Sequence, residues 1–326
     1  MTAIDEFLSQ SGWTEATHSP LAGDASSRRY ERVTRDATSA VLMITRAGEE
    51  LNRFVFLTGW LRDNGFSAPE ILAQDLSAGL LLLEDLGDDL ISTLIVNQPQ
   101  REAELYSQIT TFLTALHQVA PPQGLTELDG AGLAALTGLV DDYYPCTSDP
   151  SQISAQIAAL WAQLDDGRRV MSLRDFHAEN ALWLPDRSGI ARMGVLDYQD
   201  AVLAHPAYDL VSAFQDARRD VNAAIEARET ARYISQTGCD PTQFHAIYAL
   251  LGAQRALRIL AIFTRLCTDF GKPGYLQFMP RVWAYLHRNL SHRALAPLAR
   301  SCTVLRAPNP SMIEELRKRC ATRQMP

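Results

Sequence analysis

Three polar residues at fixed spacing could do chemistry together. Asp175 and Asn180 form a D-x-x-x-x-N pair within LRDFHAEN, and Asp197 follows within GVLDYQD. A carboxylate can accept a proton from a hydroxyl group, and amide and carboxylate oxygens are suitable ligands for Mg²⁺. Phosphoryl transfer to a hydroxyl group requires these groups and little other help from the protein. We therefore predict Asp175 as the catalytic base and Asn180 with Asp197 as magnesium ligands.

A predicted β-hairpin separates the members of this set. The segment 181–184 is β-like, a turn follows at 185–189, and 190–196 is β-like again. A D-x-x-x-x-N loop followed, across a hairpin, by an aspartate at a strand end can supply the base and both metal ligands. Taken alone, Asp175 would be better explained as a turn or cap carboxylate, and only the ordered set favours catalysis.

The rest of the chain predicts an α+β, two-lobed, protein-kinase-like fold with a small β-rich first lobe and a large helical second lobe. Residues 1–87 show a short helix, strands at 29–33 and 40–44, a helix at 49–64, and strands at 71–72 and 80–83. Residues 88–326 are mainly helical, with a long apolar-faced stretch at 241–270. We place the lobe boundary near 86–90.

Two segments of the first lobe could bind a nucleotide. Gly23, Ser26 and Ser27 belong to a turn of small residues between two predicted strands, where free backbone N–H groups could cover a triphosphate. Glu84 and Leu86 lie at the end of the lobe, as in a hinge, where backbone groups could meet an adenine. The alternatives are a plain hairpin turn for the first segment and an ordinary strand end for the second.

The sequence resembles the aminoglycoside phosphotransferase and choline kinase superfamily, and within it the bacterial anomeric N-acetylmuramate/N-acetylglucosamine kinases. The resemblance covers roughly 20–215 and implies an ATP-dependent kinase that acts on a small molecule. It also implies that Asp209 braces the catalytic loop without touching substrate. The motifs that carry it run in family order: Gly23-Asp24-Ala25-Ser26 with Arg29-Tyr30, Leu83-Glu84-Asp85-Leu86-Gly87, Arg174-Asp175-Phe176-His177 with Asn180, Leu196-Asp197-Tyr198-Gln199-Asp200-Ala201, Pro206, and Tyr208-Asp209-Leu210.

The chain departs from the superfamily pattern at two places. Leu173 stands where a histidine usually precedes the base, and no lysine occurs before Lys272, so the usual lysine that binds the phosphates is missing. By strand position Met43 replaces that lysine, and Phe54 falls near the place of its glutamate partner. The phosphates then need another cation, and guanidinium groups suit phosphate oxygens. We expect Arg29 to supply it, with Arg28 and Arg46 as alternatives.

Charge is distributed unevenly along the chain. Residues 1–205 carry 29 acidic and 13 basic side chains, a net charge of −16, whereas residues 206–326 carry 9 and 17, a net charge of +8. This balance is typical of solvated helices, or of a lobe that attracts an anionic ligand. A basic acceptor lobe opposes a polycationic aminoglycoside and suits a neutral or anionic amino sugar. N-acetylmuramate bears a carboxylate that one arginine could hold, and we cannot rank Arg218, Arg219, Arg258 and Arg265 for that role.

Other features limit the class of protein. The basic residues are dispersed, which argues against nucleic acid as a partner. The N-terminus has no signal-peptide pattern, and no apolar run approaches the roughly 20 residues that span a membrane. We expect a small-molecule substrate and no membrane partner, and the oligomeric state stays open. The five scattered cysteines predict reduced thiols and a cytoplasmic protein. The alternatives left open are an aminoglycoside or choline-type kinase, and a catalytically inactive nucleotide-binding module.

Overall fold

The computed structural model describes residues 2–21 and 28–322, which form two compact units. The first unit comprises 1–108 and 178–200, and the second comprises 109–177 and 201–326. The hairpin that follows the D-x-x-x-x-N motif therefore belongs to the first unit, and Asp175 belongs to the second. The predicted lobe boundary near residue 87 stays a prediction.

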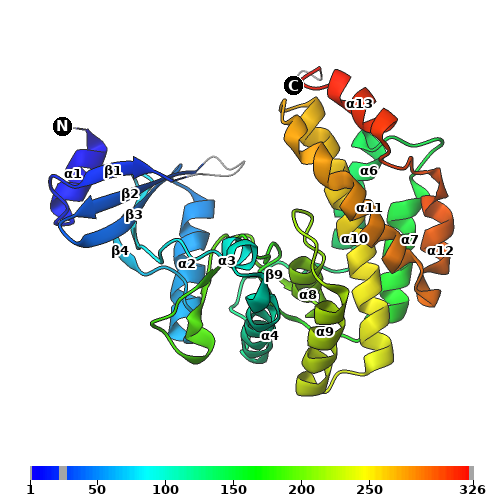
Figure 1. Ribbon diagram of the computed structural model, residues 1–326, viewed down its shortest axis with the longest axis horizontal. Coiled ribbons are helices and arrows are strands. Elements are labelled where there is room, and N and C mark those ends of the chain that lie inside the picture. Colours follow the sequence, from blue (N-terminus) through cyan, green and yellow to red (C-terminus); the bar gives the residue numbers. More distant parts are fainter. Residues whose placement is uncertain (1, 22–27, 323–326) are drawn as a thin grey trace. The chain divides into compact units, whose positions relative to one another are not determined.

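The first unit contains the strands and helices that the sequence predicted for it (Figure 1). Strand β2 begins at the predicted residue and runs two residues further, and helix α2 ends one residue early. Strand β1 was not predicted. The elements are α1 (Ala3–Gln10), β1 (Thr17–Pro20), β2 (Arg29–Arg35), β3 (Thr38–Ile44), α2 (Glu49–Asp63), β4 (Ile71–Asp75), β5 (Leu80–Glu84), α3 (Ile91–Asn97), the 3₁₀ helix Pro99–Arg101, the first part of α4 (Glu102–Gln118), β7 (Ala181–Trp183), the 3₁₀ helix Gly189–Arg192 and β8 (Met193–Val195).

The main sheet of the first unit is antiparallel, in the order β1-β2-β3-β5-β4. Alternate residues point to opposite faces of a strand, so Ala40 and Leu42 of β3 share a face. Leu42 pairs with Leu82 of β5 and is fully buried, and this face packs against Phe7 and Leu8 of α1. Met43 points the other way and is also fully buried. An apolar residue therefore occupies the strand position where the superfamily has lysine.

The β7–β8 hairpin was predicted, but its second strand is shorter than expected. Residues 190–192 belong to a 3₁₀ helix, so the predicted strand at 190–196 is wrong over its first three residues. Gly194 leaves room for its neighbours, since a Cβ there would meet Leu182, Leu184 and Leu86 at 3.3 Å each. Ser67 ties the hairpin to the segment before β4, because its carbonyl oxygen accepts from the Val195 N–H at 3.0 Å.

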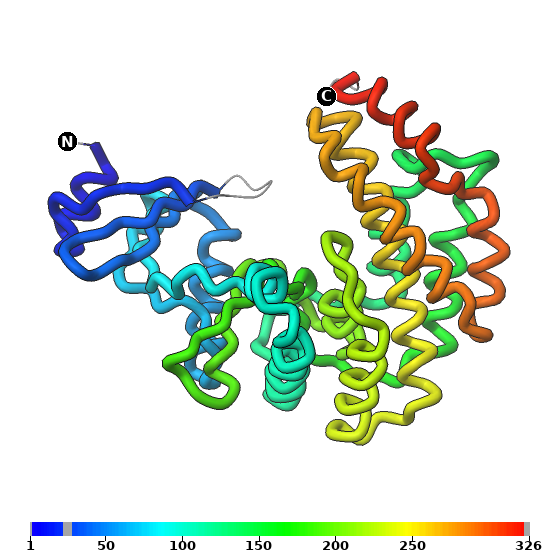
Figure 2. Tube along the Cα trace, viewed as in Figure 1, coloured from blue at the N-terminus to red at the C-terminus, as the bar shows by residue number. Residues whose placement is uncertain are grey.

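The second unit is mainly helical, as predicted, and α10 forms its centre (Figure 2). Helix α10 packs against α5, α6, α7, α8 and α11. The elements are the end of α4, α5 (Gly130–Thr137), α6 (Leu139–Tyr143), α7 (Gln152–Leu164), β6 (Val170–Ser172), β9 (Val202–Ala204), α8 (Ala207–Phe214), α9 (Ala223–Thr237), α10 (Pro241–Thr268), the 3₁₀ helix Pro273–Phe278, α11 (Met279–Leu290), the 3₁₀ helix Arg293–Leu295, α12 (Ala296–Ser301), the 3₁₀ helix Cys302–Val304 and α13 (Pro310–Lys318).

Helix α10 corrects the expectation that no segment is apolar enough to span a membrane. By length and composition it could do so, with a mean hydropathy of 1.5 over its most apolar 18 residues. However, 83% of that window is buried within the protein. A helix that is apolar on all sides is also typical of the centre of a large helical core, and this burial assigns α10 to that class.

Candidate active site

The predicted catalytic loop begins where β6 ends, and the carboxylate of Asp209 holds it. Strand β6 pairs antiparallel with β9, and α8, which carries Asp209, follows β9 directly. Asp209 is fully buried; its Oδ1 accepts from the Ser172 hydroxyl at 2.7 Å and from the Arg174 N–H at 3.0 Å, and its Oδ2 accepts from the Leu173 N–H at 2.9 Å. Charged acceptors make stronger hydrogen bonds than neutral ones. Asp209 therefore braces the loop, as the resemblance implied.

The backbone just before Asp175 is strained. Arg174 has a φ of 73°, in the left-handed region that residues other than glycine rarely adopt. Such a conformation persists only where its surroundings impose it. Here Asp209 accepts from the N–H of Arg174, and Arg255 of α10 donates from Nη1 to its carbonyl oxygen at 2.7 Å. The two contacts fix the peptide groups on both sides of the strained residue, and so fix the start of the Asp175 side chain.

The Asp175 carboxylate has a basic environment within the second unit. Its side chain is 44% exposed, and its Oδ1 lies 3.5 Å from Nη2 of Arg255. Burial raises the pKa of the Asp175 carboxyl, but nearby positive charges, led by Arg255 and Arg258, lower it by more. The net pKa lies below the ordinary value, so Asp175 is ionised at neutral pH. An ionised, accessible carboxylate on a rigid loop is what a general base requires.

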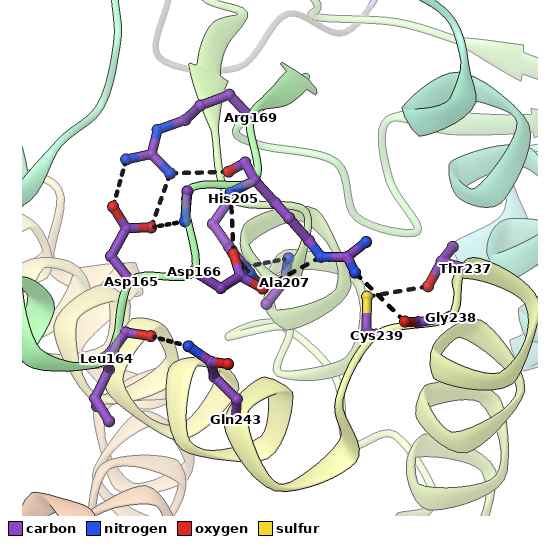
Figure 3. A network of polar contacts seen from close by, with 12 residues as sticks. Leu164, Asp165, Asp166, Arg169, His205, Ala207, Thr237, Gly238, Cys239 and Gln243 are labelled. Carbon is purple, nitrogen blue, oxygen red and sulfur yellow. Dashed lines mark hydrogen bonds and ion pairs between the residues drawn. The ribbon is translucent and has the colours of Figure 1, made fainter.

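A polar network fixes the start of α8, and with it Asp209 (Figure 3). Nδ1 of His205 accepts from the Ala207 N–H at 3.1 Å, so the ring proton must lie on Nε2, which is 3.3 Å from Oδ1 of Asp166. Burial lowers the pKa of His205, in keeping with a neutral ring. Burial raises the pKa of Asp166, but the nearby His205 ring and other contacts bring it to about 2. Sequence reasoning missed this network, because it joins segments far apart along the chain.

The hairpin brings the two predicted metal ligands to one end of the first unit's small sheet. Ala181 pairs with Val195, and one residue further out the Leu196 N–H donates to the carbonyl oxygen of Asn180 at 2.9 Å. Asn180, which precedes β7, and Asp197, which comes after β8, thus lie at the same end of this two-stranded sheet. Asp197 is 49% exposed on its side chain and has a φ of 57°, a second left-handed residue.

The chemistry of these two residues fits a hard cation. Both offer oxygen atoms, which Mg²⁺ prefers. Oδ1 of Asp197 accepts from Nε2 of Gln199 at 2.7 Å, while Oδ2 makes no hydrogen bond with another residue in the described part of the chain. A half-exposed carboxylate oriented by a neighbouring amide is therefore open on one oxygen. Asn180 and Asp197 remain the predicted ligands.

Tyr198 anchors the Asp197 backbone to α2. Its hydroxyl group lies 2.6 Å from the Thr58 hydroxyl, and its ring stacks on Phe54 with centroids 5.2 Å apart. Burial raises the pKa of Tyr198, so it stays neutral and acts only through packing and this hydrogen bond. Phe54 therefore supports the loop that carries Asp197, by an apolar contact on α2.

The three arginines considered for the missing lysine differ sharply in their surroundings. Arg29, the preferred one, is 62% exposed on its side chain and lies 3.2 Å from Glu31, and Arg46 is exposed. Arg28 is 5% exposed on its side chain; it forms an ion pair with Glu50 in the first turn of α2, and its Nη1 is 3.7 Å from Oδ1 of Asp197. The structure thus holds an arginine–glutamate pair beside the predicted metal ligand, which the sequence did not indicate.

The predicted adenine-binding residues lie at the end of β5. The Glu84 N–H already donates to the Glu70 carbonyl oxygen at 2.7 Å, and the Glu84 carboxylate pairs with Arg62 and Arg187. An adenine contact at Glu84 would therefore fall to its carbonyl oxygen. Leu86 is half-buried. The phosphate-turn residues Gly23, Ser26 and Ser27 lie outside the described residues.

Comparison with known proteins identifies the class. The sequence pattern of the phosphotransferase enzyme family matches residues 17–245, and the chain belongs to that family. The predicted class, a kinase acting on a small molecule, is confirmed. The chain is 39% identical to the N-acetylmuramate/N-acetylglucosamine kinase of Caulobacter vibrioides, over 90% of this chain and 93% of the relative. It is 30% identical to the Pseudomonas aeruginosa protein of the same name, over 90% of both chains.

Solved structures confirm the kinase-like fold. A putative aminoglycoside phosphotransferase from Ralstonia eutropha aligns with a TM-score of 0.63 at 14% identity, over 93% of this chain and 98% of the other. At this identity the likeness concerns the fold alone. It agrees with the small antiparallel sheet and the helical remainder described above.

Proposed function

We propose that the protein is an ATP- and Mg²⁺-dependent kinase that phosphorylates an N-acetyl amino sugar at its anomeric hydroxyl group, in the cytoplasm. The observation that carries the proposal is the 39% identity, over nine tenths of both chains, with a relative named for N-acetylmuramate and N-acetylglucosamine. Asp175 accepts the hydroxyl proton as the sugar oxygen attacks the γ-phosphorus, the bond from that phosphorus to the β–γ bridging oxygen breaks, and ADP leaves. An anomeric hydroxyl group is more acidic than an ordinary alcohol, so a carboxylate base suffices.

The nucleotide side of the proposal uses residues of the first unit. Asn180 and Asp197 are the magnesium ligands, and the metal, when bound, neutralises charge on the phosphate oxygens. Gly23, Ser26 and Ser27, which lie outside the described residues, are the residues that we propose to contact the phosphates. The end of β5 presents backbone groups to the adenine.

The charges around Asp175 favour a neutral or anionic acceptor over a polycation. Within the second unit, four basic groups are near enough to lower the Asp175 pKa: Arg255, Arg258, His177 and Arg174. An aminoglycoside carries several ammonium groups, which such surroundings would repel. An uncharged N-acetyl group and a carboxylate are both compatible with them.

A panel of four acceptors tests the proposal. We expect Mg-ATP to phosphorylate N-acetylmuramate or N-acetylglucosamine, with kcat/KM at least about 10²-fold above kanamycin or choline, the size of discrimination that unfavourable charge contacts provide. Coupled measurement of ADP release and phosphorus NMR of the product would show the acceptor and the position. Turnover of kanamycin or choline, with none of either sugar, would show that the proposed acceptor is wrong. Absence of turnover with all four acceptors, together with retained ATP binding, would favour the inactive nucleotide-binding module.

We also propose that Arg28 takes the role of the missing lysine, because it is the buried cation beside Asp197. Replacing Arg28 by methionine is expected to weaken ATP binding by about 1.5–3 kcal/mol, the value of a charge-assisted hydrogen bond. Glu50 is 61% exposed on its side chain, so leaving it unpaired should cost little stability. Calorimetric titration with Mg-ATP would measure the loss, and adenosine, which has no phosphates, should bind the variant as it binds the parent.

Arg29→Ala is the matched comparison for Arg28→Met. Arg29 is adjacent in sequence, but its side chain is mostly exposed. We expect ATP affinity to change less than about twofold, as for an exposed ion pair. If Arg29→Ala loses affinity for ATP and Arg28→Met does not, Arg29 is the residue that binds the phosphates.

A further inference from the structure

Arg258 differs from the other arginines of the second unit that we considered for an anionic substrate. Its guanidinium group forms no ion pair within 2–21 and 28–322, and this sets it apart. Its Nε is buried without a hydrogen-bond partner, which is also true of the Nε atoms of Arg219 and Arg265. The residue as a whole is half-buried. A partly desolvated charge without a partner is costly, and an anionic ligand bound to it would offset that cost.

The other three arginines already have contacts. Arg265 lies over the rings of Tyr143 and Phe270, at 5.6 and 5.5 Å from their centroids. Nη1 of Arg218 lies 3.1 Å from Nε2 of His177. Arg219 also has interactions within the protein. The structure therefore ranks the four residues that the sequence could not, and Arg258 comes first.

The position of Arg258 relates it to the catalytic base. It lies three residues after Arg255 on α10, a spacing that puts two side chains on the same face of a helix. Arg255 is committed to the catalytic loop and to Ser212, whose hydroxyl accepts from Nη2 at 2.8 Å. Arg258 is near enough to Asp175 to act on its charge, yet it makes no hydrogen bond with it in the described chain. A guanidinium group next to the base thus remains available to a substrate.

We propose that Arg258 binds the carboxylate of an acidic acceptor sugar beside Asp175, and that it sets the preference for N-acetylmuramate over N-acetylglucosamine. This inference rests on the proposed function. N-acetylmuramate carries a lactyl carboxylate that N-acetylglucosamine lacks, so the two sugars differ by the group that Arg258 recognises. Guanidinium binds carboxylate through two parallel hydrogen bonds, which adds orientation to affinity. Arg255 holds the base, and Arg258 orients the acceptor relative to it.

The experiment compares both sugars in one variant, Arg258→Gln. Without ATP, calorimetric titration should show N-acetylmuramate binding weakened about 10–100-fold, the range for a lost charge-assisted hydrogen bond, with N-acetylglucosamine changed less than about twofold. Steady-state kinetics should show the same split in KM. Arg258→Lys keeps the charge without the planar fork, so its loss should be intermediate. Arg300→Gln, an exposed arginine on α12, removes the same charge from this unit and should leave both sugars unaffected.

Each other outcome contradicts the inference in a recognisable way. An equal fall in kcat for both sugars would place Arg258 at the transferred phosphoryl group or assign it to support of Asp175. Unchanged binding of both sugars would remove it from the acceptor site. If Arg258→Gln fails to fold, judged by its melting temperature, Arg258→Lys decides by the ratio of the two KM values. A parent protein that neither binds nor phosphorylates either sugar would overturn the proposed function first, and this inference with it.

Discussion

Replacing Asp175 by asparagine is expected to lower kcat by about 10²–10⁴-fold while leaving ATP affinity within about twofold, because general-base catalysis contributes in that range. Asparagine has the same shape and keeps an oxygen for Arg255, so the loop should stay in place. Stopped assays at saturating sugar and Mg-ATP would give kcat, and titration calorimetry the ATP dissociation constant. Asp186→Asn, in the exposed turn after β7, is the control for loss of a carboxylate. A full-rate Asp175→Asn enzyme would contradict the assignment.

The pH dependence follows from the same carboxylate. Because neighbouring positive charges bring the Asp175 pKa below its ordinary value, the base remains deprotonated as the pH falls through the usual aspartate range, about 3.9. Activity carried by this group is therefore present at neutral pH and is lost only below that range. An acidic limb of kcat/KM near pH 6 would have to come from another group.

Replacing Asp197 by asparagine is expected to reduce turnover by about 10²–10⁴-fold, since a bound metal supplies several kcal/mol of charge stabilisation to the transferring phosphates. Asparagine tolerates the left-handed conformation of this residue, so the backbone should not change. The effect should appear in binding as well: Mg²⁺ should strengthen ATP binding to the parent and much less to the variant.

A matched control separates the metal role of Asp197 from general charge. Asp200 is exposed, lies three residues further along, and can be changed to asparagine in the same way. Asp200→Asn should keep both turnover and the magnesium dependence of ATP binding. An Asp197→Asn protein with normal magnesium dependence would remove Asp197 from the metal site.

The sequence predicted the elements that rest on local patterns. An alternating pattern marked β2, a continuous apolar run marked β3, and the helical spacing of Leu51, Phe54 and Leu61 marked α2 to within a residue. The hairpin was visible from its turn residues, and it explains why Asn180 and Asp197 end up together. These features follow from contacts between near neighbours in the chain, so a single sequence contains them.

Short elements held by distant contacts could not be predicted. Strands β6 and β9 have three residues each and pair across about thirty positions, too short for a periodic signal. Strand β1 is exposed along its whole length and carries no apolar alternation. Residues 190–192 were predicted as part of a strand, yet they belong to a 3₁₀ helix. The hydroxyl group of Ser67, distant in sequence, donates to the carbonyl oxygen of Ala191 in that helix.

The sequence by itself determined which chemical groups this protein has: a base candidate at Asp175, oxygen ligands at Asn180 and Asp197, and no lysine for the phosphates. Only the tertiary structure decided which arginine lies close to these groups. Arg28 and Arg29 are neighbours in the chain, but only Arg28 is buried against Glu50 and Asp197. The physical reason is that charge is set by residue type, whereas burial and pairing depend on residues brought together from distant parts of the chain.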